Sequence, residues 1–251
     1  MSEWRFTGLE FELLWSAYGR DRLPYPLRYR PEPMDFRDLR RLREAAVTTL
    51  TGMYAVELER ALDVLLEPDV RIEITGLDDT DPARLVRFHG AIRANAGTAL
   101  TQEPGPAPDT GADIVLRYGR AAQVAAAAVA ALPDRPPGSQ PPIRLPRTDI
   151  RTDRDRPLRA TNGAIAQLDR VFARRRRALG EVTVFPGPAI DARPAPGEGF
   201  WWMDYDDGRY LVRTGDPIEA APLSADAMVT EIERRAVRAQ RWHRENERAS
   251  G

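Results

Sequence analysis

The order of hydrophobic and polar positions divides the chain into helical and strand-like stretches. Residues 8–19, 35–50 and 55–67 carry apolar side chains three and four positions apart, which predicts three amphipathic helices. From Val70 to Thr75 the pattern changes to strict alternation, which indicates a β-strand. The chain therefore begins with helices and continues into a sheet.

The order strand, hairpin, strand, helix occurs twice along the chain. The first copy spans about 69–132 and the second about 181–249. Short strands joined by tight turns favour antiparallel pairing, and helices with one apolar stripe pack on such a sheet. The pattern predicts an α+β fold: a central antiparallel sheet flanked by helices, with two halves related by a quasi-twofold axis.

The stretch between the two copies has a different composition. Six prolines lie between Pro133 and Pro146, and many arginines but few apolar residues follow them. Such a composition is typical of a linker or loosely tethered segment. We therefore expect a single domain over 1–251, with an N-terminal half at 1–132, a Pro/Arg-rich linker at 133–162 and a C-terminal half at 163–251.

The most aromatic stretch of the chain, FWWMDYDDGRYLV, predicts a β-hairpin. An Asp-Gly pair at 207–208 favours a type I′ turn, which would pair Tyr205 with Tyr210 and Trp202 with Arg213. One face of this hairpin is continuously apolar and is expected to be core. The other face is mixed, and a Trp beside an Arg is typical of an interface anchor. Burial beneath the protein's own helices is the alternative for that face.

The composition narrows the classes of function. The chain has no cysteine and no lysine, only two histidines, and a formal net charge of −1. Disulfides, thiolate metal sites and lysine chemistry are thereby excluded, and no metal or cofactor is expected. The balanced charge argues against a nucleic-acid partner, and the four arginines at 174–177 are expected at a solvated helix end. With no apolar run long enough for a membrane span and no signal peptide, we expect a cytoplasmic protein with no membrane partner.

Three aspartates in the hairpin raise an enzymatic alternative. Asp204, Asp206 and Asp207 cluster in sequence, and a carboxylate pair could support acid–base hydrolysis. Aspartate is also favoured in turns for backbone reasons, and His89 on a strand is expected to be an ordinary hydrogen-bonded histidine. A non-catalytic protein-interaction module is a further alternative.

Three motifs carry a family resemblance. LPYPL begins at Leu23, ADIVLRYGRAAQVAAAAVAALP begins at Ala112, and WMDYDDGRYLV begins at Trp202. In this order the chain resembles the EspG family, the cytosolic chaperones of ESX (type VII) secretion in actinobacteria, over residues 6–236. The resemblance implies the EspG-like fold, no catalysis, and binding of the helical tip of a PPE-type substrate, usually carried as a PE–PPE heterodimer.

The resemblance also implies where the partner is bound. In the family the loop between the second and third strands, here 76–83, and the C-terminal helical layer meet the substrate. Together with the mixed face of the hairpin, the predicted partner-binding residues are Leu77, Asp78, Asp79, Thr80, Phe200, Trp202, Arg213, Ile232 and Arg235.

Overall fold

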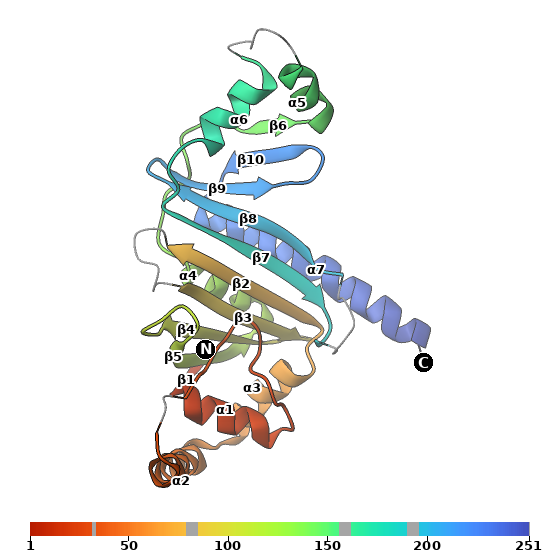
Figure 1. The fold of residues 1–251 in the computed structure, drawn as a ribbon. Coiled ribbons are helices and arrows are strands. Elements are labelled where there is room, and N and C mark those ends of the chain that lie inside the picture. The colour runs from red at the N-terminus through yellow and green to blue at the C-terminus, as the bar shows by residue number, and fades with distance from the viewer. Residues whose placement is uncertain (32–33, 79–84, 156–161, 190–195, 251) are drawn as a thin grey trace.

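A computed structural model describes residues 1–31, 34–78, 85–155, 162–189 and 196–250 of the chain. Its centre is a ten-stranded sheet in which the named strands pair antiparallel, in the order β1-β5-β4-β3-β2-β7-β8-β9-β10-β6 (Figure 1). The strands are β1 (Ser2–Phe6), β2 (Val70–Asp78), β3 (Leu85–Arg93), β4 (Ala96–Pro104), β5 (Gly111–Arg120), β6 (Ile143–Leu145), β7 (Ala178–Pro186), β8 (Glu198–Tyr205), β9 (Gly208–Arg213) and β10 (Ile218–Pro222). The predicted α+β class with a central antiparallel sheet is confirmed.

The sheet has the predicted quasi-twofold arrangement. Strands β2 to β5 run outward from the centre on one side, and β7 to β10 run outward on the other. The two units meet where β2 and β7 pair antiparallel, with Ile74 opposite Val182. The helix α4 (Val124–Ala130) follows the first unit and α7 (Ala225–Ser250) follows the second. The domain boundaries proposed from the sequence remain a prediction, because one sheet crosses both halves.

One face of the sheet is covered by α4 and α7, which lie behind it in Figure 1. Ser224 caps the N-terminus of α7, since its side-chain oxygen accepts a hydrogen bond from the backbone N–H of Ala227 at 3.2 Å. The core beneath these two helices draws on β2, β3, β7 and β8, and its largest members are Phe88, Phe200, Trp202, Met228 and Ile232.

The opposite face, called here the open face, carries helices only at its two ends in the part of the chain that the structure describes. The helices α1 (Gly8–Ala17) and α3 (Val56–Leu66) pack on β3, β4 and β5, and α2 (Phe36–Met53) packs on α1. At the other end α5 (Arg147–Arg154) and α6 (Ala164–Phe172) share an apolar cluster with β6, β8, β9 and β10. Figure 1 shows both helices at the edge of the sheet next to β6. Within the described part of the chain, no helix covers the open face at β2 and β7.

The aromatic hairpin forms, but in a different register from the predicted one. Met203 rather than Tyr205 faces Tyr210, and Trp202 faces Leu211 rather than Arg213. The two turn positions are Asp206 and Asp207, so the predicted turn at 207–208 is wrong. The Asp207 carboxylate accepts hydrogen bonds from Ser139 and Tyr210, which anchor it outside the strand ladder. The slip is an even number of positions, so each side chain keeps its predicted face.

The segment expected to be a loose linker is packed where the structure describes it. It forms β6, which pairs with β10 at the edge of the sheet, and α5. Before β6, backbone hydrogen bonds join Pro136 and Gly138 to Arg209, at 2.8 and 2.9 Å. The expectation of loose tethering is therefore wrong for residues 133–155. Backbone and guanidinium contacts with Arg209 hold this segment in place, together with burial of Ile143 and Leu145.

The four arginines at 174–177 do not lie on a helix end as predicted. Helix α6 ends at Phe172, and the arginines form the connection to β7. The Arg174 guanidinium stacks on the rings of Tyr205 and Tyr210, with centroid distances of 4.2 and 5.1 Å. Arg174 therefore packs on the hairpin through cation–π contacts and does not continue α6.

Candidate partner-binding site

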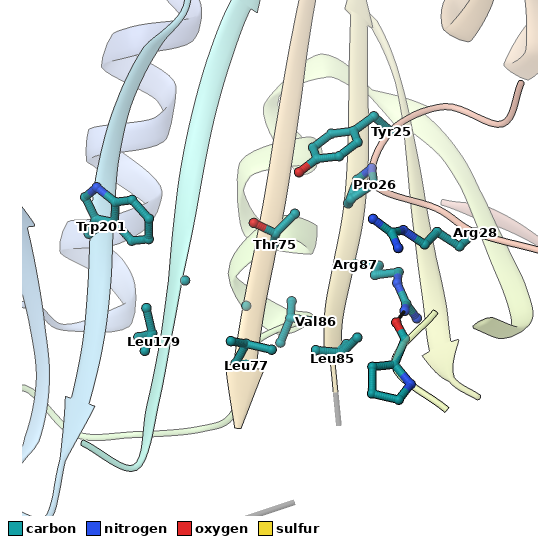
Figure 2. A pocket seen from close by; sticks show the side chains of 13 residues that line it. Tyr25, Pro26, Arg28, Thr75, Leu77, Leu85, Val86, Arg87, Leu179 and Trp201 are labelled. Atoms are coloured by element: carbon teal, nitrogen blue, oxygen red, sulfur yellow. Dashed lines mark hydrogen bonds between the residues drawn. The ribbon is translucent and has the colours of Figure 1, made fainter. Parts of the chain in front are cut away.

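A hollow lies on the open face beside the C-terminal end of β2 and the N-terminal end of β3. We call this end of the two strands the tip of the β2–β3 pair. Thr75 and Leu77 of β2 form the floor of the hollow, with Leu179 of β7 and Trp201 of β8 on one side. Figure 2 shows Tyr25, Pro26 and Arg28 on the opposite side, carried by the segment that follows α1. The hollow has a volume of about 260 Å³, and we call it the open-face hollow.

A second hollow of about 310 Å³ lies at the same end of β2 and β3, on the face that carries α4. Val86, Leu132 and Pro133 give it an apolar lining, and Leu77 and Arg87 take part in both hollows. The tip of the β2–β3 pair therefore stands between two recesses. A protein bound at this tip could contact both faces of the sheet.

Leu77 is the exposed apolar side chain of this tip. It is 51% exposed although it lies in a strand. Single exposed leucines are common on protein surfaces, but a leucine between two apolar recesses forms part of a larger apolar patch. Arg87, which is buried, donates hydrogen bonds to the backbone oxygens of Pro108 and Thr110 and lies at the edge of that patch. The tip thus combines the apolar surface at Leu77 with a buried guanidinium that binds the backbone at 108–110.

Farther along the open face, three ionisable side chains are buried against the segment at Tyr25. Arg71 contacts Glu73 at 2.5 Å, and burial raises the pKa of Glu73 to about 7, although Arg71 opposes that rise. The Nδ1 atom of His89 lies 2.7 Å from the backbone oxygen of Tyr25; a carbonyl only accepts, so Nδ1 donates. Burial lowers the pKa of His89 to about 4, so its ring is neutral at pH 7. As predicted, His89 has an ordinary structural hydrogen bond.

The residues predicted on the β2–β3 loop are partly described. Leu77 and Asp78 end β2, and both lie beside hollows at the tip. Asp79 and Thr80 lie outside the described residues. The structure therefore brings the two described members of this group to the candidate site.

The aromatic residues predicted to meet the partner are buried instead. Trp202 is 0% exposed and Phe200 is 2% exposed, both beneath α7. The Trp202 ring packs closely against Gly76 and Gly180, where a Cβ on either glycine would collide with the indole. Of the two alternatives for the mixed hairpin face, the structure shows burial beneath the protein's own helices for Trp202 and Phe200. Gly76 in β2 and Gly180 in β7 leave space for the Trp202 ring. The hairpin sequence alone does not show that these two glycines lie beside the ring.

Three further predicted residues, Arg213 in β9 and Ile232 and Arg235 in α7, hold α7 to the sheet. Ile232 is buried in the core, and Arg235 is 6% exposed and contacts the Phe200 ring at 5.2 Å. Arg213 and Arg235 both donate to Glu231, each at 2.8 Å. Burial alone would raise the pKa of Glu231, but hydrogen bonds from arginines keep it below its usual value. A partner role for these residues remains a prediction, and their described contacts are internal.

The three hairpin aspartates each have structural partners. Asp204 is fully buried and receives two hydrogen bonds from Arg209, at 2.7 and 2.8 Å. Asp206 pairs with Arg177, and Asp207 accepts from Tyr210 at 2.5 Å. Asp204 therefore stabilises the start of β9, and the other two stabilise the turn. These contacts weigh against the hydrolase alternative.

Sequence reasoning missed Tyr25, Arg28, Arg87, Leu179 and Trp201 as site residues. Trp201 lies on the hairpin face that is expected to be core, yet it is half-buried and lines the open-face hollow. The LPYPL motif was a usable signal, since two prolines fix an extended segment that can cross a sheet face. Which face it crosses follows only from the packing of α1.

The described residues contain neither a candidate membrane span nor a candidate metal cluster. None of the described helices combines the length and apolar character needed to cross a bilayer. No cluster of three or more His, Asp or Glu side chains suited to a metal ion occurs in the ranges that the structure describes.

Comparison with known proteins places the chain in a family. No curated protein matches it. A family model described as EspG family matches residues 7–234, which is nearly the whole chain. The EspG family is a family of chaperones associated with ESX secretion. The fold, the two-unit sheet and this match agree with the resemblance seen in the sequence, and the chain belongs to the EspG family.

Proposed function

We propose that the protein is a cytoplasmic, non-catalytic chaperone that binds the helical tip of a PPE-type substrate, alone or in a PE–PPE pair, and keeps it soluble before ESX secretion. The observation that carries the proposal is the half-exposed Leu77 between two hollows at the tip of β2 and β3. A cytoplasmic location follows from the role, because the substrate must be held before export.

The geometry suits a helical tip rather than a small molecule. The open-face hollow is apolar at Leu179 and Trp201, and the exposed Arg28 lies at its margin. Helix-in-groove recognition uses apolar anchors a few residues apart, and charged rims guide the encounter. The gap between the helices at the two ends of the open face would leave room for a helix end to reach these anchors.

Co-expression with a PPE-like protein, with and without its PE-like partner, tests the proposal. Wild-type chaperone should give a soluble complex on gel filtration. Leu77→Asp should weaken the complex by roughly thirtyfold or more, because it removes an apolar anchor and places a charge between the two hollows. Val56→Asp is the matched control, since Val56 is 63% exposed at the start of α3 and lies away from the hollows.

The outcomes separate the function from the site. No complex with any PPE-like candidate would refute the proposed function. A complex that Leu77→Asp and Val56→Asp support equally would leave the function standing and remove the β2–β3 tip from the site. Both variants should melt like the wild type, because both side chains are exposed.

A further inference from the structure

Helix α2 leaves much of its apolar surface uncovered. Phe36 is 79% exposed, Val47 is 51% exposed and Leu42 is 47% exposed. Ala46 is the single buried residue of this 18-residue helix. An isolated helix of this length is only marginally stable in water, and burial of an apolar face normally supplies the remainder. The contact with α1 supplies only part of that burial.

The exposed side chains include one regular stripe. Phe36, Arg40, Arg43 and Val47 are spaced four, three and four residues apart, which places them on one side of the helix. We call these four residues the α2 stripe. The more protected positions, Leu39, Ala46 and Leu50, lie next to it toward α1. The stripe therefore runs along the flank of the contact with α1, as an apolar–basic–basic–apolar surface.

The charges of α2 select the partner's chemistry. The helix contains four arginines, one aspartate and one glutamate. Arg40 pairs with Glu44 at 3.4 Å, and Arg41 pairs with Asp38 at 3.8 Å, which uses both acidic side chains. Arg43 has no ion pair among the residues that the structure describes. An acidic partner would supply carboxylates to the basic centre of the stripe.

The same charges disfavour a second copy of this chain. A two-fold antiparallel pairing that joins Phe36 to Val47 of the other copy would place Arg40 beside Arg43. Like charges placed in direct contact across an interface oppose binding. Self-association through the stripe would therefore lack the charge complementarity that a different, acidic partner provides.

We propose that the α2 stripe docks an acidic amphipathic helix of a partner protein, with apolar side chains on Phe36 and Val47 and carboxylates on Arg40 and Arg43. Figure 1 shows α2 at the outer end of the N-terminal half, with α1 between it and the sheet. The surface is thus separate from the hollows at Leu77. It goes beyond the proposed function, because it would let the chaperone hold a second protein while its substrate site is occupied.

The absence of cysteine makes a direct test possible. Val47→Cys in the full chain can carry a single environment-sensitive fluorophore within the stripe. Ala45→Cys is the matched control, because Ala45 is exposed on the opposite side of the same helix. Thermal melting of both labelled proteins checks that α2 and the rest of the fold are intact.

The probe is a synthetic 18-residue peptide with leucines spaced four, three and four apart and glutamates flanking them. A second peptide has lysine at every glutamate position. The acidic peptide should shift the emission at residue 47 saturably and bind at least about tenfold more tightly than the basic one. The label at residue 45 should respond weakly to either. Arg43→Glu should weaken the acidic peptide about tenfold and strengthen the basic one.

Three results would overturn the proposal. One is that neither peptide changes the signal at residue 47. Another is that both peptides bind equally, which would indicate unspecific apolar contact. The third is a shift that depends on protein concentration alone and accompanies a doubled mass in light scattering, which would make the stripe a contact between copies. No secretion substrate is used, so failure here leaves the proposed substrate site untouched.

Discussion

Replacing Trp202 by alanine is expected to destabilise the fold strongly. The side chain is 0% exposed and lies between the α4/α7 core and the backbone of Gly76 and Gly180. A buried tryptophan removes about 150–250 Å² from water, which at about 25 cal/mol per Å² corresponds to about 4–6 kcal/mol. Truncations of buried aromatic residues cost about 3–5 kcal/mol. A loss of about 4 kcal/mol lowers the melting temperature of a chain of this size by roughly 8–16 °C.

Two matched variants sharpen this prediction. Trp201→Ala should cost less stability, because Trp201 is half-buried at the open-face hollow, and it should weaken substrate binding. Trp202→Phe should recover most of the loss, because the Nε1 atom of Trp202 has no hydrogen-bond partner among the described residues. Its replacement therefore removes packing volume without breaking a hydrogen bond.

Differential scanning calorimetry and urea unfolding of the three variants provide the measurement. The reasoning is refuted if Trp202→Ala melts within about 3 °C of the wild type while Trp201→Ala falls by roughly 8 °C or more. That result would mean that Trp201, not Trp202, is the buried member of the pair. Equal losses for Trp202→Phe and Trp202→Ala would show that the indole N–H has a stabilising partner.

Two further predictions concern the sheet interior. Gly180→Ala should destabilise by about 2–3 kcal/mol in urea unfolding, because its Cβ would collide with the backbone oxygen of Thr75 and the Trp202 indole; Gly215→Ala, where nothing lies within 4 Å, should be neutral, and equal effects would contradict the close approach. Burial lowers the pKa of His89 from 6.5 to about 4, so the stability it contributes is present above pH 6.5 and is lost as the pH falls toward 4. The free energy of unfolding should fall by about 2 kcal/mol between pH 7 and pH 5 through this group. His89→Gln should reduce this pH dependence. If the unfolding free energy of His89→Gln follows the wild-type curve from pH 7 to pH 5, the assignment to His89 is disproved.

The sequence by itself determined the central two-unit sheet and the helices after each unit, but not the edge strands β1 and β6. Alternation in Val70–Thr75 and periodicity in the helices depend on which side of an element meets the core, and this is a local property of the chain. The same rule assigned the faces of the aromatic hairpin correctly, even though its register was wrong. The motif order was also sufficient to indicate the EspG family, which the family model confirms.

Only the tertiary structure decided which faces are covered and where the candidate site lies. Periodicity shows that Trp202 and Phe200 share a face, but not that glycines in β2 and β7 receive the indole and that α7 closes over it. The residues of the hollow come from the α1 connection, β2, β3, β7 and β8, so their proximity depends on pairings between distant segments. The Pro/Arg-rich segment is packed by hydrogen bonds from Arg209, a non-local contact that composition cannot reveal. Local sequence fixes the orientation of each side chain, whereas burial depends on which distant segment packs against it.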